Sequence, residues 1–122
     1  MSGKTILIVD DSQSMRQLIK MTLTGAGHQV IEAVDGRDAL SKLNGQKINL
    51  IISDVNMPNL DGIGLVKEVK TRSEYRFTPI VMLTTESEQG KKAEGQAAGA
   101  KAWIVKPFQP QQLLAAVDKL VG

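Results

Sequence analysis

The residues of this chain best suited to chemistry come directly after short apolar runs. Asp10 and Asp11 follow the first run, Asp54 another, Thr84 a third and Lys106 a fourth. Crowded carboxylates repel one another unless a cation lies among them. Mg²⁺ fits because it accepts one or two carboxylates, keeps several waters and bridges to phosphate oxygens. A lysine ammonium suits a phosphoryl group, and an aspartate can be the nucleophile toward phosphorus. The set predicts a phosphoryl site.

Each of these residues also has a purely structural explanation. Asp11 with Ser12 would make a good helix N-cap, and the segment after Asp54 has the composition of a loop. Thr84 would serve as a strand end, and Lys106 with the following proline as a turn. The chemical interpretation is favoured because all of these residues follow runs of the same kind.

The runs themselves read as strands of a buried parallel sheet, each followed by a segment of helical period. Strict alternation of this kind predicts an α/β fold, an open doubly wound five-stranded parallel sheet with five helices. The carboxyl ends of such strands meet at one edge of the sheet, where ligands bind. The predicted strands are Ile6–Val9, Val30–Val34, Leu50–Ile52, Ile80–Leu83 and Ala102–Val105. The predicted helices are Gln13–Ala26 behind a Ser12 N-cap, Arg37–Leu43, Ile63–Lys70, Glu88–Ala98, and a last one striped by Leu113, Leu114, Val117, Leu120 and Val121.

Composition limits the function further. The chain has 122 residues, 15 Lys plus Arg against 13 Asp plus Glu, no cysteine and one histidine. That length suits a single domain, and the side chains exclude thiol nucleophiles and Cys-type or His-rich metal sites. A net charge of +2 is too small to predict nucleic-acid binding. No apolar run is long enough for a membrane span, so we expect a soluble, cytoplasmic protein.

The predicted helix Glu88–Ala98 differs from the others because it contains Gly90 and Gly95 and offers mostly alanine for burial. Two interior glycines cost about 2 kcal/mol relative to alanine. We therefore expect this helix to be the least firmly held, either as a surface helix packed closely through small residues or as an element that must move.

Four motifs together resemble the signatures of response-regulator receiver domains, and the likeness covers essentially the whole chain. They are Ile6 to Ser12 (ILIVDDS), Ser53 to Pro58 (SDVNMP) with Asp61 and Gly62, Met82 to Thr85 (MLTT), and Val105 to Phe108 (VKPF). Within that family the chain is similar to single-domain receivers of the chemotaxis type. The resemblance implies a flavodoxin-like sheet with strand order 2-1-3-4-5. It also implies one receiver domain over residues 1–122 with no output domain.

The resemblance assigns roles to the residues around the acids. Asp54 would accept a phosphoryl group from a histidine of a sensor kinase. The carboxylates of Asp11 and Asp54 with the backbone carbonyl of Asn56 would bind Mg²⁺, and Asp10 would act on the ion through water. Asn56 and Glu86 would tune the rate at which the chain hydrolyses its own phosphate.

Three further residues complete the implied machinery. Thr84 would reach one phosphoryl oxygen and Lys106 another, with a cis peptide bond between Lys106 and Pro107. Trp103 stands where the family usually has the Tyr or Phe of its switch, turning into the space that Thr84 leaves. A simpler interpretation of Trp103, as an indole packed on the sheet edge, remains open at this point.

The resemblance implies a monomeric signalling domain that binds neither nucleic acid nor membrane. Its expected partners are a CheA-like sensor histidine kinase and possible readers such as a flagellar motor switch protein or a phosphatase. The chain would catalyse only its own phosphorylation and dephosphorylation. The alternatives are a phosphate sink, a receiver that serves another target, a phosphohydrolase, a flavodoxin-like cofactor binder, and a passive interaction domain. A phosphohydrolase needs a cap that this length does not supply, and paired acids in the first loop repel the phosphate of a cofactor.

Overall fold

The computed structural model describes residues 3–85 and 92–121, and these residues alternate strands with helices along the chain. The strands are β1 (Thr5–Val9), β2 (Gln29–Ala33), β3 (Leu50–Asp54), β4 (Ile80–Thr84) and β5 (Ala102–Val105). The helices are α1 (Gln13–Gly25), α2 (Gly36–Lys42), α3 (Gly62–Lys70), α4 (Lys92–Ala98) and α5 (Pro110–Val121).

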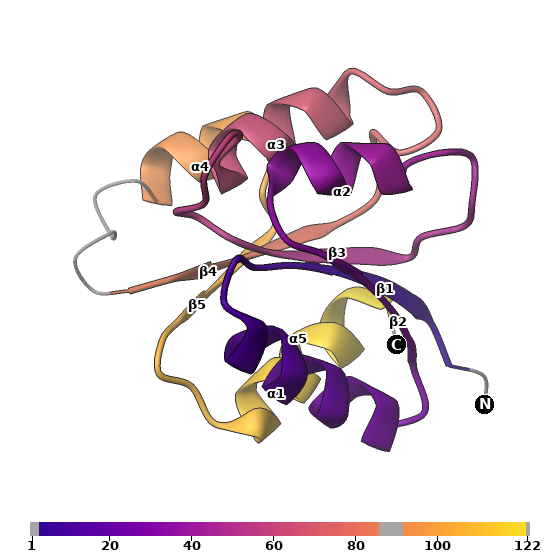
Figure 1. Ribbon diagram of the computed structural model, residues 1–122, viewed down its shortest axis with the longest axis vertical. Helices are drawn as coiled ribbons and strands as arrows, with labels where there is room; N and C mark the ends of the chain where they lie inside the picture. Colours follow the sequence, from indigo (N-terminus) through magenta and orange to yellow (C-terminus); the bar gives the residue numbers. More distant parts are fainter. Residues whose placement is uncertain (1–2, 86–91, 122) are drawn as a thin grey trace.

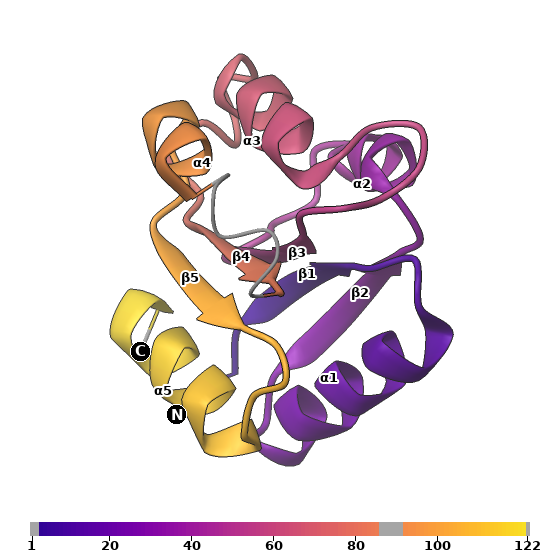
Figure 2. The ribbon, with the colours of Figure 1, turned by 90° about the vertical axis from the view of Figure 1, so that its left-hand side faces the viewer.

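The five strands form one parallel sheet in the order β2-β1-β3-β4-β5, which confirms the predicted topology. Helices α2, α3 and α4 cover one face of this sheet, while α1 and α5 cover the other (Figure 1). Turning the molecule shows the twisted sheet between the two helical layers (Figure 2). Because every crossover passes through a helix, all strands run the same way and their carboxyl ends meet at one edge.

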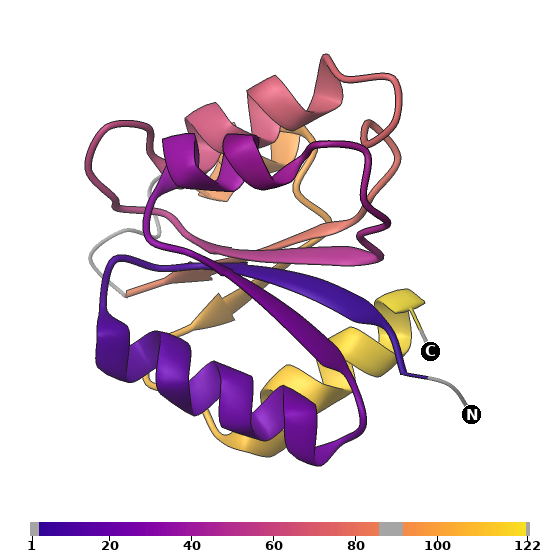
Figure 3. The same cartoon turned by 45° about the vertical axis from the view of Figure 1, so that its right-hand side comes forward.

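The core consists of two apolar layers, one on each face of the sheet. Successive side chains of a strand point to opposite faces, so Leu7 and Ile51 pack toward α2 and α3, whereas Ile6 and Ile52 pack toward α1 and α5. Strands β3 and β4 are buried along their whole length. Figure 3 shows β3 and β4 between the layers. Burial on both faces explains why these strands read as continuous apolar runs.

The helix boundaries follow from local capping. The hydroxyl of Ser12 accepts a hydrogen bond from the backbone N–H of Met15 at 3.3 Å, which is the predicted N-cap of α1. Helices α2 and α3 each begin one residue earlier than predicted, because Asp35 and Asp61 cap them.

Helix α4 runs from Lys92 to Ala98 in the structure, whereas the sequence predicted Glu88–Ala98. Its predicted residues 88–91, including Gly90, lie outside the described residues. Among the residues that are described, no helix is long and apolar enough to cross a membrane.

Candidate functional site

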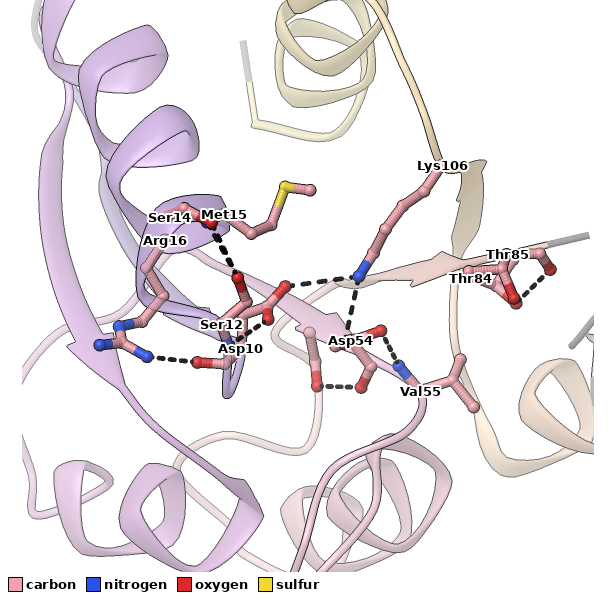
Figure 4. A network of polar contacts seen from close by, with 11 residues as sticks. Asp10, Ser12, Ser14, Met15, Arg16, Asp54, Val55, Thr84, Thr85 and Lys106 are labelled. Atoms are coloured by element: carbon pink, nitrogen blue, oxygen red, sulfur yellow. Dashed lines mark hydrogen bonds and ion pairs between the residues drawn. The ribbon is translucent and has the colours of Figure 1, made fainter.

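The carboxyl edge of the sheet gathers side chains that are far apart in the sequence. Asp10 follows β1, Asp54 ends β3, Thr84 ends β4, and Lys106 follows β5. Val9 pairs with Ser53 and Thr84 pairs with Val105 in the ladders, so these ends are neighbours in space. Figure 4 shows the ammonium of Lys106 between Asp10 and Asp54.

Three carboxylates form a cluster of oxygen ligands. Asp10, Asp11 and Asp54 each offer a carboxylate oxygen, and these atoms all lie within 4.8 Å of one another. Asp10 and Asp54 are buried, while Asp11 is exposed and closes the cluster on the solvent side. Asn56 lies two residues beyond Asp54 in an exposed part of the β3–α3 loop. A donor set made only of oxygen suits a hard divalent cation.

Lys106 supplies the positive charge at this cluster. Its Nζ lies 3.1 Å from Asp54 Oδ2 and 3.6 Å from Asp10 Oδ2. Burial of the ammonium favours the neutral amine, but attraction to Asp10 and to Asp54 outweighs it, so the pKa of Lys106 is raised. The Lys106–Pro107 peptide bond is cis, as the resemblance implied. The lysine therefore stays charged at neutral pH and faces the carboxylate of Asp54.

The carboxylate of Asp54 is held at its other oxygen and at its backbone. Oδ1 accepts a hydrogen bond from the N–H of Val55 at 2.9 Å. The start of α3 approaches so closely that a Cβ on Gly62 would lie 2.3 Å from the carbonyl oxygen of Asp54. Only glycine fits there, and the N–H of Gly62 donates to the carbonyl of Val55 at 2.8 Å. Helix α3 thus holds the end of β3 in place.

Asp10 is held equally firmly through its other carboxylate oxygen and its backbone, while its Oδ2 faces the Lys106 ammonium at 3.6 Å. Its Oδ1 accepts from the N–H of Ser12 at 2.8 Å, and its backbone carbonyl accepts from Nη1 of Arg16 at 2.7 Å. The Nε of Arg16 in turn lies 3.4 Å from a carboxylate oxygen of Glu32. Buried Oδ2 of Asp10 receives no hydrogen bond from any described residue. A buried carboxylate oxygen in this state fits a role toward a cation.

Thr84 and Trp103 lie on the same face of the sheet, beneath α4. Met82 pairs with Trp103 in the β4–β5 ladder and Thr84 lies two residues further, so alternation puts all three on one face. The hydroxyl of Thr84 donates to the carbonyl of Thr85 at 3.1 Å. A Cβ on Gly95 would lie 2.4 Å from Cζ2 of Trp103. The indole therefore fills the space that a larger residue in α4 would need.

Glu86, which the resemblance connects with phosphate hydrolysis, lies outside the described residues.

The sequence analysis did not single out one pair beside the site, Asp35 after β2 and Asn59 in the β3–α3 loop. Asp35 is buried; its Oδ1 caps α2 by accepting from the N–H of Asp38 at 2.8 Å. Its Oδ2 accepts from Nδ2 of Asn59 at 2.6 Å. The hydrogen bond from the backbone of Asp38 lowers the pKa of Asp35 most, and the hydrogen bond from Asn59 lowers it further. The pair joins the β3–α3 loop to α2, and an Asp before a predicted helix was the available signal.

Comparison with known proteins agrees with this geometry. Residues 6–118 match the family model described as Response regulator receiver domain. The chain is 40% identical over 119 residues to the Chemotaxis protein CheY homolog of Campylobacter jejuni, which covers 96% of this chain and 92% of the relative. Its structure is similar to that of chemotaxis response regulator CheY4 of Vibrio cholerae, with 49% identity, a TM-score of 0.91, and coverage of 98% of this chain and 99% of the other.

A second similar structure bears on the metal. The receiver domain of sensor histidine kinase PA1611 from Pseudomonas aeruginosa was solved with a magnesium ion coordinated in its active site cleft. It is 28% identical to this chain, with a TM-score of 0.91 and coverage of 99% of each chain.

Proposed function

The chain belongs to the response regulator receiver domain family and is CheY-like, and from that premise we propose that it is a phosphorylation switch with Asp54 as the phosphoryl acceptor. The observation that carries the proposal is the buried Asp54 carboxylate, which faces the Lys106 ammonium at 3.1 Å inside a cluster of acids. Lys106 pairs with two buried carboxylates, Asp10 and Asp54, and charged groups perturbed in this way cluster at functional sites.

The oxygen cluster supports binding of Mg²⁺ by Asp11 and Asp54 with the backbone carbonyl of Asn56, and by Asp10 through water. All the donors are oxygen, and the buried Oδ2 of Asp10 has no hydrogen bond among the described residues. Mg²⁺ held there would supply positive charge that compensates the charge of a phosphoryl group.

The chemical step takes place between Asp54 and a phosphodonor, with Mg²⁺ required at the acids. A carboxylate oxygen of Asp54 attacks phosphorus, a new P–O bond forms, and the bond from phosphorus to the donor breaks as the donor leaves with its electron pair. Lys106 compensates the negative charge on one phosphoryl oxygen, and the Thr84 hydroxyl donates to another. Because Val55 and Gly62 hold Asp54, little reorganisation is required before attack. The donor is a phosphohistidine of a sensor kinase of the CheA type.

The conformational response runs from Thr84 to Trp103. Movement of the Thr84 hydroxyl toward the phosphoryl group changes the space available to the indole, which contacts α4 at Gly95. The altered face comprises α4, β5 and α5, and a protein such as a flagellar motor switch component or a phosphatase binds it. An open groove on this face is lined by Trp103, Lys106 and Gln112 among others. Asn56 and Glu86 set the lifetime of the phosphate.

The proposal is tested by intact-mass spectrometry after incubation with acetyl phosphate, with and without Mg²⁺. The expected result is the gain of one phosphoryl group that requires Mg²⁺ and is lost in Asp54→Asn. Asp118→Asn, which alters an exposed aspartate on α5, is the matched control and should be phosphorylated normally. Phosphorylation that persists in Asp54→Asn, or that never occurs in the native chain, would contradict the assignment.

A further inference from the structure

The end of the sheet opposite the carboxylates presents an exposed aromatic ring. The loop between α3 and β4 lies at this end (Figure 1) and carries Phe77, whose side chain is 82% exposed. That fraction exceeds the 66% of Met21, the next most exposed large apolar side chain among the described residues. The guanidinium carbon of Arg76 lies 4.9 Å from the centre of the Phe77 ring. The pair forms a cation–π contact that orients the ring.

The backbone that carries Phe77 is fixed on both sides. Nζ of Lys70 donates to the carbonyls of Arg76 at 2.9 Å and Thr78 at 3.1 Å. The N–H of Thr78 donates to the carbonyl of Tyr75 at 2.9 Å, and Tyr75 is itself buried. An exposed apolar side chain on a rigid backbone loses little conformational entropy when a partner covers it.

The segment that carries the ring is basic. Residues 67–79 together with Lys101 contain five lysines and arginines against two glutamates, a local charge of +3 compared with +2 for the whole chain. Within the described part of the chain, none of these five bases forms an ion pair. The bases are Lys67, Lys70, Arg72, Arg76 and Lys101.

Two of these bases repel each other. Burial lowers the pKa of Lys70, and the charge of nearby Lys101 lowers it further. Since no described carboxylate pairs with either side chain, an incoming anion would relieve the repulsion. A ligand that complements this surface therefore carries negative charge together with an apolar group that covers Phe77.

We propose that Lys70, Arg76, Phe77 and Lys101 form a docking site for an acidic peptide segment of a partner protein that carries an apolar side chain among its carboxylates. We call these four residues the Phe77 patch. Positive charge around an aromatic anchor is complementary to such a segment. A membrane is disfavoured because one ring offers little apolar area for insertion. Single-stranded nucleic acid is disfavoured because it stacks on successive aromatic side chains, and the patch has one.

The site acts independently of Asp54, because it lies at the other end of the strands. A partner held there would remain bound while the acidic site is phosphorylated and dephosphorylated.

The probe is the dye-labelled peptide acetyl-Glu-Glu-Leu-Phe-Glu-Glu-amide, measured by fluorescence anisotropy against the native chain. We expect saturable binding that weakens with added salt. Phe77→Ser should weaken binding about tenfold, since the loss of one buried aromatic contact has that magnitude. Arg76→Gln should weaken it as well and reduce the salt dependence.

Matched controls distinguish binding at this site from nonspecific binding elsewhere on the surface. Met21→Ser removes another exposed apolar side chain, and Lys119→Gln removes another exposed base. Both should leave the affinity unchanged, as should Asp54→Asn, and a peptide with serines in place of Leu-Phe should bind far more weakly. The proposal is overturned if the native chain does not bind the peptide, or if the control variants lose as much affinity for it as Phe77→Ser does. It is also overturned if Phe77 instead controls binding to vesicles of anionic lipid or to a single-stranded oligonucleotide, or self-association seen by sedimentation.

Discussion

Replacing Gly95 by alanine tests whether the α4 glycine exists to accommodate the indole. Alanine is favoured over glycine in a helix interior by about 1 kcal/mol, so helix propensity alone predicts a more stable protein. The new Cβ would lie 2.4 Å from Cζ2 and 2.8 Å from Cη2 of Trp103, whereas ordinary contact begins near 3.4 Å. Either the ring or the helix must therefore move by about 1 Å.

Overpacking of this kind costs about 1–3 kcal/mol, which exceeds the gain in propensity. We expect Gly95→Ala to lower the free energy of unfolding by about 1 kcal/mol in the native background. In a Trp103→Val background the indole is absent, and Gly95→Ala should raise the free energy of unfolding by about 1 kcal/mol. The change of sign, a coupling of about 2 kcal/mol, is the signature of direct contact.

Urea unfolding of the four proteins, followed by circular dichroism, measures this cycle. Tryptophan emission of Gly95→Ala should also shift, because the displaced indole meets a different environment. Equal stabilisation by alanine in both backgrounds would refute the packing explanation and would mean that Gly95 only lowers the helix propensity of α4.

Three further predictions concern the residues around the acceptor. Gly62→Ala should lower the free energy of unfolding by about 2 kcal/mol or more in urea unfolding, because its Cβ would meet the carbonyl of Asp54 at 2.3 Å. Asp35→Ala should lower the free energy of unfolding by about 1–2 kcal/mol because the cap of α2 is lost, and Asp35→Asn should lower it less. Since the pKa of Asp35 is lowered on folding, its contribution is present above pH 3.8 and fades as pH falls below it, so acid titration should show this loss in the native protein and not in Asp35→Asn. The pKa of Lys106 is raised, so its stabilisation is full below pH 10.5 and fades above it; the gap in stability between the native protein and Lys106→Met should narrow over that alkaline range.

The sequence predicted the fold because its signals are local and agree with one another. Runs such as Ile80–Leu83 are buried on both faces and read as strands without tertiary information. Asp10, Asp54 and Lys106 could be grouped because parallel topology alone brings strand ends to one edge.

What the sequence did not predict depends on contacts across the chain. The Asp35–Asn59 hydrogen bond joins two loops 24 positions apart, and no pattern in either loop points to the other. From the sequence Gly95 only weakens its helix, because the indole that occupies the space beside it belongs to Trp103 in β5.

The acids and Lys106 are proposed to make Asp54, and no other carboxylate, the phosphoryl acceptor. Borohydride reduction after acetyl phosphate treatment converts an aspartyl phosphate to homoserine, and peptide mass spectrometry then locates the modified residue. We expect homoserine at position 54 only, dependent on Mg²⁺. Homoserine at position 10 or 11, or at no position under conditions that phosphorylate the chain, would contradict it.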